Sequence, residues 1–185
     1  MWDFQKTLAQ NEKMCHNREK RGFDFMIKPD YEFKSILDIE NDFFEKEGIE
    51  YLLIDIDNTL VADNAPDADE RAVSFLKSLQ EKGISFYLVS NNTEERVKSF
   101  NRDLDYPYIF RARKPFSKKI RAVMKEMGAK KENTALIGDQ IFTDLLASKN
   151  SGIRMILVSP INTKIENTFF KVKRFLEKLV YKRQF

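Results

Sequence analysis

The sequence predicts an α/β fold, with a parallel sheet of about five strands covered by helices on both faces. Two observations predict it. Short, mainly apolar runs recur along the chain, beginning with residues 51–54, and such runs are typical of strands buried on both faces. Between the runs lie longer segments with apolar residues at helical spacing. Strands that alternate with helices favour a parallel sheet with right-handed crossovers.

Each element follows from its local pattern. Strands are expected at residues 51–54, 84–89, 108–110, 134–137 and 153–158. Helices are expected at residues 33–46, 67–82, 115–127, 140–150 and 164–182, and another opens at residues 92–95. Asn92 would cap that helix, with Glu95 three places later, and Pro115 suits the first turn of the next helix.

Composition limits the function classes. The chain has 185 residues, 42% of them apolar and 33% charged, as expected for one globular domain. The longest uncharged apolar runs are far shorter than the roughly 18 residues of a membrane-spanning helix. The N-terminus lacks the layout of a secretion signal, so we expect a cytoplasmic protein. Cys15 is the only cysteine, which excludes a disulfide framework and a cysteine-based zinc cluster.

Polar residues follow four of the predicted strands. In chain order they are Asp55 and Asp57, then Ser90 and Asn91, then Lys114, and last Asp139 with Asp144. Each group alone has an ordinary explanation as a turn, a helix cap or a solvated charge. The carboxyl ends of parallel strands meet at one edge of a sheet, and ligands bind there. The combination therefore indicates a functional site at that edge.

The residue types indicate a magnesium site that handles phosphate. Carboxylates in one crevice repel each other unless a cation or protons compensate. Mg²⁺ prefers oxygen ligands and is usually held by one or two carboxylates, waters and substrate phosphate. We expect Asp55, Asp139 and the backbone carbonyl of Asp57 as ligands, with Asp144 in the first or second coordination shell.

The same residues can carry out phosphoryl transfer. A carboxylate beside a metal ion can attack phosphorus and form an aspartyl-phosphate, and Asp55 is the candidate nucleophile. Asp57 would protonate the leaving oxygen and then take a proton from water. Ser90 and Lys114 would hold the phosphoryl group, and backbone N–H groups after Asp57 would add further donors.

These residues resemble the motifs of the haloacid dehalogenase superfamily of phosphohydrolases. The matching motifs are Asp55-x-Asp57-x-Thr59, the strand end at Ser90, Lys114-Pro115 and Gly138-Asp139-x-x-x-x-Asp144. The resemblance implies a three-layer Rossmann-like fold and an aspartyl-phosphate mechanism. It implies phosphate contacts from Ser90, Asn91, Lys114 and Thr59, and a Mg²⁺ site formed by Asp55, Asp57, Asp139 and Asp144. Asp at position 57 favours phosphatase over dehalogenase chemistry.

Two features bear on the substrate. The segments 58–89 and 91–113 are used up by predicted elements, so neither can hold the cap domain that many members of the superfamily carry. An active site without a cap domain has an open mouth, which suits a phosphate group carried on a large molecule or surface. Residues 26–30, 35–39, 53–61, 90–92 and 138–144 resemble the capless YqeG-type family of subclass IIIA. Relatives of that family in mitochondria and chloroplasts are phosphatidylglycerophosphate phosphatases, which implies hydrolysis of phosphatidylglycerophosphate to phosphatidylglycerol.

Other functions stay open. One is a phosphatase for a soluble phosphometabolite or a phosphoprotein, and another is a partner-binding protein with weak catalysis. The second is disfavoured because every catalytic position holds the expected residue. An oligomer that covers the mouth is an alternative to an open site.

The expected domain organisation places a polar arm at residues 1–24, the phosphatase domain at 25–163 and a basic amphipathic helix of the same domain at 164–185. The formal charge of +3 is too small to indicate nucleic-acid binding. Two interpretations of the last helix stay open. It packs on the sheet with a solvated basic face, or its basic face makes peripheral contact with an anionic membrane.

Overall fold

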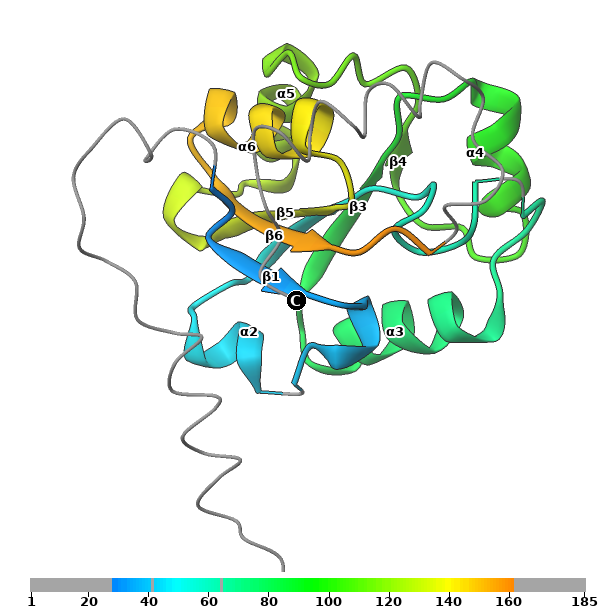
Figure 1. Cartoon of the computed structure of the whole chain (residues 1–185), viewed down its shortest axis with the longest axis horizontal. Helices are drawn as coiled ribbons and strands as arrows, with labels where there is room; N and C mark the ends of the chain where they lie inside the picture. The colour runs from blue at the N-terminus through cyan, green and yellow to red at the C-terminus, as the bar shows by residue number, and fades with distance from the viewer. Residues whose placement is uncertain (1–27, 41, 64, 162–185) are drawn as a thin grey trace, which may run out of the picture.

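The computed structural model describes residues 28–40, 42–63 and 65–161. Within these residues the centre is a six-stranded sheet, parallel throughout, in the order β1-β6-β5-β2-β3-β4 (Figure 1). The strands are β1 (Tyr31–Phe33), β2 (Tyr51–Ile54), β3 (Ser85–Val89), β4 (Tyr108–Ile109), β5 (Thr134–Gly138) and β6 (Arg154–Val158). Because β2 lies between β5 and β3, the residues that follow it reach the middle of one sheet edge.

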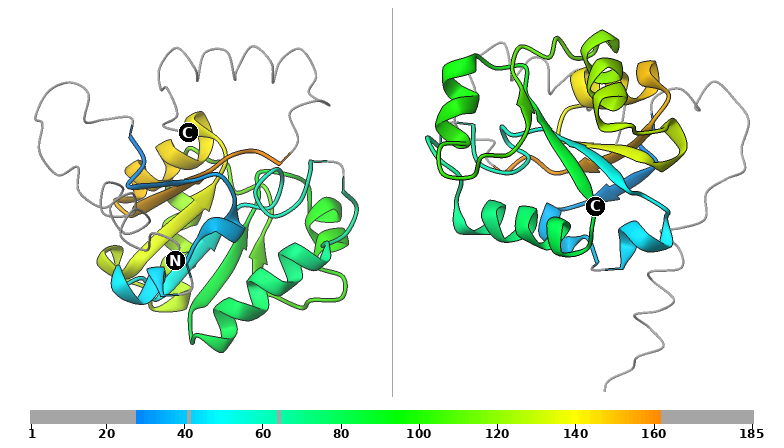
Figure 2. Two further views of the ribbon diagram at one scale, coloured as in Figure 1. Left: turned by 60° about the horizontal axis from the view of Figure 1, so that its bottom comes forward. Right: turned by 180° about the vertical axis from the view of Figure 1, so that it is seen from behind.

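Helices cover both faces of the sheet. They are α2 (Phe43–Lys46), α3 (Glu70–Glu81), α4 (Glu94–Phe100), α5 (Lys118–Met127) and α6 (Leu146–Ser151). One core cluster joins a sheet face to α2, α3 and α4, and a second joins the other face to α5 and α6. Figures 1 and 2 show these two helical layers with the sheet between them. The predicted three-layer α/β fold is confirmed.

The central strand shows why an apolar run predicts a buried strand. Leu52 and Ile54 of β2 belong to the first core cluster, and Leu53 belongs to the second. All three are fully buried, because alternate side chains of a strand point to opposite faces and both faces carry helices.

The single helix predicted over residues 33–46 is wrong. The chain forms β1, which pairs with β6, then a 3₁₀ turn at Ile36–Asp38 and the short α2. Ile39 is extended, with φ −77° and ψ 112°, which interrupts any helix there. Ile36 and Phe44 are buried all the same. The apolar spacing identified core residues but not their conformation, since a three-residue strand is too short to show a period-two pattern.

The start of α5 also differs from the prediction. It begins at Lys118, so Pro115 lies before its first turn. The Asn91 side chain accepts a hydrogen bond from the Lys114 N–H at 2.7 Å and donates one to its carbonyl at 2.9 Å. These two bonds hold the stretch before Pro115 in a loop.

Two further helix starts are shifted. α4 is capped by Thr93 rather than Asn92, because the Asn92 side chain accepts a hydrogen bond from the Thr93 N–H instead. The helix predicted over residues 140–150 opens with a π-helical turn, Ile141–Leu145, and continues as α6. Such turns are rare and are frequently found at functional sites.

Some predictions concern residues that lie outside the described ranges. They include the polar arm at 1–24 and the basic helix at 164–185, so both interpretations of that helix stay open. Across residues 28–40, 42–63 and 65–161, no helix has both the length and the apolar character needed to cross a bilayer.

Candidate active site

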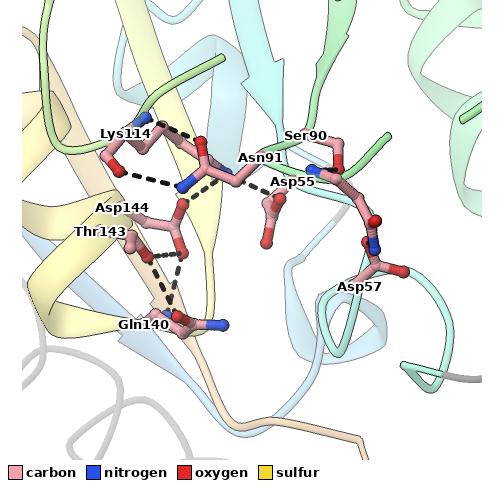
Figure 3. A network of polar contacts seen from close by, with 9 residues as sticks. Asp55, Asp57, Ser90, Asn91, Lys114, Gln140, Thr143 and Asp144 are labelled. Atoms are coloured by element: carbon pink, nitrogen blue, oxygen red, sulfur yellow. Dashed lines mark hydrogen bonds and ion pairs between the residues drawn. The ribbon is translucent and has the colours of Figure 1, made fainter. Parts of the chain in front are cut away.

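The structure brings the predicted site residues together at the carboxyl edge of the sheet. Asp55 follows β2, Ser90 follows β3, Asp139 follows β5, and Lys114 lies in the loop after β4. All four are at least 94% buried, with exposed fractions between 1% and 6%. Figure 3 shows Asp55, Lys114 and Asp144, which come from three separate segments, meeting at one point. Parallel strands explain the convergence, because their carboxyl ends share one edge.

Lys114 is the centre of the charge network. Its Nζ donates to Asp55 Oδ1 at 2.7 Å and lies 2.6 Å from Asp144 Oδ1 (Figure 3). The three side chains are between 0% and 8% exposed. Because these charges are deeply buried, removal of Lys114 would leave both carboxylates uncompensated.

The electrostatics of this network follow from burial. Burial raises the pKa of Asp55 to about 7, with Asp144 and Asp57 adding to the rise and Lys114 opposing it. Burial alone would lower the pKa of Lys114. The nearby carboxylates of Asp144 and Asp55 together have the larger effect and raise this pKa above its ordinary value. Lys114 therefore stays protonated, and the crowded carboxylates favour any additional cation.

Asp144 is oriented by the π-helical turn and by Gly138. Its Oδ2 accepts a hydrogen bond from the Gln140 N–H at 3.0 Å. Gly138 is needed because a Cβ there would lie 2.4 Å from Asp144 Cγ. The last residue of β5 must therefore lack a side chain if Asp144 is to reach Lys114.

We expect Gly138→Ala to displace Asp144 and to lower the free energy of unfolding by about 1–3 kcal/mol, a typical cost of overpacking. Metal-dependent phosphatase activity should fall as well, since Asp144 leaves its place. Denaturant unfolding and steady-state assays measure the two effects. The control is Gly48→Ala, where φ is 59° and no atom lies within 4 Å of the added Cβ. It should lose stability but keep its activity, and equal activity in both variants would contradict the expected displacement of Asp144.

The predicted phosphate-binding residues differ in their surroundings. The Ser90 Oγ accepts a hydrogen bond from the Asn92 N–H at 3.0 Å, so it also forms the turn that leads to α4. The Thr59 hydroxyl is buried and makes no hydrogen bond within the described part of the chain. Asn91 contacts the backbone of Lys114, which gives it a positioning role in this structure. Direct phosphate contacts by these residues stay predictions.

The backbone donors expected after Asp57 are used within the loop. The Asn58 N–H donates to the Val61 carbonyl at 2.7 Å, and the Thr59 N–H donates to the Ile56 carbonyl at 3.3 Å. Asn58 has a φ of 61°, so the chain turns back tightly at this point. These two N–H groups are therefore engaged within the loop in this conformation, and phosphate contacts by backbone N–H groups stay a prediction.

Arg96 is a site residue that sequence reasoning missed. Its Nε donates to Asp57 Oδ1 at 3.0 Å and its Nη2 lies 2.8 Å from the same oxygen. Asn92 donates to the other carboxylate oxygen of Asp57 at 3.4 Å. Burial raises the pKa of Asp57, and the Arg96 charge opposes the rise. The only sequence signal was the place of Arg96 in the first turn of a helix that follows a site strand.

We expect Arg96→Gln to impair catalysis selectively, because Asp57 would lose the guanidinium that orients it. General acid catalysis matters most for leaving groups that need a proton. The kcat for an alkyl phosphate should fall at least about tenfold, while p-nitrophenyl phosphate should be much less affected. The matched control is Lys98→Gln on the exposed side of the same helix. Equal losses on both esters would show that Arg96 is only structural.

The carboxylates fit a divalent cation. Asp55, Asp139 and Asp144 each place one oxygen within 4.8 Å of the others, and all three are buried. Hard divalent cations such as Mg²⁺ bind oxygen donors of this kind. The Asp57 side chain pairs with Arg96 instead, and a metal contact from the Asp57 backbone carbonyl stays a prediction.

Comparisons with known proteins agree with this site. The family model described as "Haloacid dehalogenase-like hydrolase" matches residues 1–158. The chain is 38% identical over 133 residues to "Probable phosphatase YqeG" of Bacillus subtilis, which is 72% of this chain and 77% of that protein.

Solved structures show the same fold. The cobalt-bound deoxy-D-mannose-octulosonate 8-phosphate phosphatase of Haemophilus influenzae has a TM-score of 0.52 at 17% identity, over 72% of this chain and 88% of that one. The 3-deoxy-D-manno-octulosonate 8-phosphate phosphatase of Moraxella catarrhalis, in complex with magnesium, phosphate and its KDO molecule, has a TM-score of 0.52 at 16% identity, over 75% and 91%. The predicted enzyme class, a phosphatase, is confirmed, and the chain belongs to the haloacid dehalogenase-like hydrolases.

Proposed function

We propose that this phosphatase is a Mg²⁺-dependent phosphomonoesterase that works through an aspartyl-phosphate on Asp55. One observation carries the proposal. The Asp55 carboxylate lies at the end of the central strand, 2.7 Å from the buried Lys114 Nζ and within a cluster of three carboxylates. A nucleophile, a fixed positive charge and a place for a divalent cation are thus combined at one point.

The reaction follows from these side chains. An Asp55 oxygen forms a bond to phosphorus as the bond from phosphorus to the ester oxygen breaks, and Asp57 gives that oxygen its proton. Asp57 then takes a proton from water, whose oxygen attacks the phosphoryl group and frees Asp55 and inorganic phosphate. Lys114 offsets negative charge that develops on the phosphoryl oxygens.

A divalent cation, when bound, would neutralise phosphate charge and orient the phosphoryl group for in-line attack. Asp55, Asp139 and Asp144 would hold it, together with the backbone carbonyl of Asp57. The three carboxylates repel each other, and Lys114 alone compensates only part of their charge.

The substrate we propose is phosphatidylglycerophosphate, with phosphatidylglycerol and phosphate as products. The site supports a large carrier, because α3 and β3 occupy residues 70–89 and no cap domain stands among the described residues between Asp57 and Ser90. A lid normally encloses a small substrate. The 38% identity to "Probable phosphatase YqeG" supports the resemblance to the YqeG-type family, and it is this resemblance that suggests the lipid substrate.

Phosphate release from the full-length protein tests the proposal. The panel contains phosphatidylglycerophosphate in vesicles, a soluble sugar phosphate and a phosphopeptide, each with Mg²⁺ or with a chelator. We expect the lipid to be preferred and the chelator to stop turnover. Preference for a soluble ester or the phosphopeptide would overturn the lipid assignment. A lack of turnover on every ester would instead indicate a partner-binding protein.

A further inference from the structure

Exposed large apolar side chains lie on the side of the sheet where the site opens. Among the described residues these are Leu37, Phe116 and Ile161, with exposed fractions of 55%, 69% and 39%. Leu37 follows the end of β1, Phe116 lies in the loop after β4, and Ile161 follows β6. Since the strands are parallel, all three stand in connections that leave the carboxyl edge. β1 and β4 are the two edge strands of the sheet, so Leu37 and Phe116 stand apart, and Phe116 is the most exposed of the three.

The loop after β4 adds positive charge to this side. Residues 111–121 contain six Lys and Arg and no Asp or Glu. Some of these charges are engaged, because Lys114 is in the site, Lys119 donates to the Phe110 carbonyl and Arg121 donates to the Asn150 carbonyl. Of the other three, Arg111, Arg113 and Lys118, each is exposed.

Backbone hydrogen bonds fix which side chains of this loop face outward. Arg111 and Ala112 donate to the carbonyls of Asn92 and Ser90, each at 2.9 Å. Burial alternates along the segment, with Ala112 and Lys114 buried and the arginines at 111 and 113 exposed. In this segment the Lys114 side chain is therefore buried in the site, while Arg111 and Arg113 are exposed to solvent.

We propose that Arg111, Arg113, Phe116 and Lys118 form a rim surface that docks the mouth of the site on an anionic lipid bilayer. The inference rests on the proposed lipid substrate and assigns the surface that would meet it. Phe116 is two residues from Lys114, and two residues span at most about 7 Å. A bilayer that contacts Phe116 would therefore lie close to the loop that carries Lys114 into the site.

A bilayer fits this surface better than nucleic acid does. Interfacial binding combines an apolar side chain at acyl depth with basic groups at the head groups, and the rim surface has both. Nucleic-acid binding relies on many phosphate contacts along the backbone. The rim surface offers only three exposed cations for such contacts.

Cosedimentation with vesicles tests the proposal on the full-length protein. The vesicles contain either phosphatidylcholine alone or a mixture with phosphatidylglycerol, and a single-stranded oligonucleotide serves as a separate probe. Wild type should bind the anionic vesicles. Arg113→Gln with Lys118→Gln should lower the partition coefficient at least about tenfold, and Phe116→Ser should lower it to a similar extent. The matched control, Lys77→Gln with Lys125→Gln, removes the same charge from exposed positions on α3 and α5.

The outcomes separate this surface from the catalytic proposal. The rim surface is supported if wild type binds the vesicles and the rim variants, with unchanged unfolding midpoints, do not. This result holds whether or not the lipid is hydrolysed. Equal binding by the rim and control variants, no binding by wild type, or preference for the oligonucleotide overturns it. Vesicle binding without hydrolysis of phosphatidylglycerophosphate overturns the proposed substrate alone.

Discussion

Asp55→Asn is expected to reduce metal-dependent phosphate release by about 10⁴-fold or more, as the loss of a catalytic nucleophile typically does. The amide nearly matches the carboxylate in shape and can still accept a hydrogen bond from Lys114, which is 2.7 Å away. It lacks the charge needed to attack phosphorus. Steady-state assays with the best ester of the panel measure the loss, and acid-quenched protein should carry no phosphoryl group.

The control for this change is Asp63→Asn. Asp63 lies in the same loop but is exposed, so its replacement should leave turnover nearly unchanged. If Asp55→Asn keeps substantial Mg²⁺-dependent turnover, or if a phosphoryl group still becomes attached to the protein, the nucleophile is a different residue.

Lys114→Met is expected to lower the free energy of unfolding by about 3–5 kcal/mol in metal-free buffer, the usual cost of removing one member of a buried ion pair. Asp55 and Asp144 would then face each other without the ammonium group that lies within 2.7 Å of both. Activity should fall about 10²–10³-fold, because charge on the phosphoryl oxygens loses its fixed partner.

Mg²⁺ should restore part of the lost stability, since a cation that binds only the folded state stabilises it. Urea unfolding of wild type and Lys114→Met, with and without Mg²⁺, measures this difference. Lys125→Met, at an exposed position on α5, should stay within about 0.5 kcal/mol of wild type. A loss in Lys114→Met no larger than this would show that the buried pair contributes little.

Much of the site could be predicted from the sequence because its residues follow strands. An apolar run shows where a strand ends, and a parallel sheet brings those ends to one edge. Asp55, Ser90 and Asp139 were located in this way. The use of the loop N–H groups could not be foreseen, because it depends on the turn at Asn58, where φ is 61°.

The sequence pattern could not predict which charged side chains pair when the two residues are far apart along the chain. Arg96 reaches Asp57 across 39 positions, and Lys114 reaches Asp55 across 59. Which charge meets which carboxylate depends on the strand order, since β3 lies beside β2 and brings α4 and the loop after β4 toward it. Charged side chains carry no periodic signal of their partners.

The sequence by itself determined the α/β class, the buried strands β2, β3, β5 and β6, and the motifs of the site, because burial on both faces demands apolar runs and turns demand polar residues. Only the tertiary structure decided the pairing of β1 with β6, the placement of Lys114 between two carboxylates and the pairing of Arg96 with Asp57. These features depend on contacts between distant segments. Such contacts form only when the sheet brings the segments together, so no local pattern encodes them.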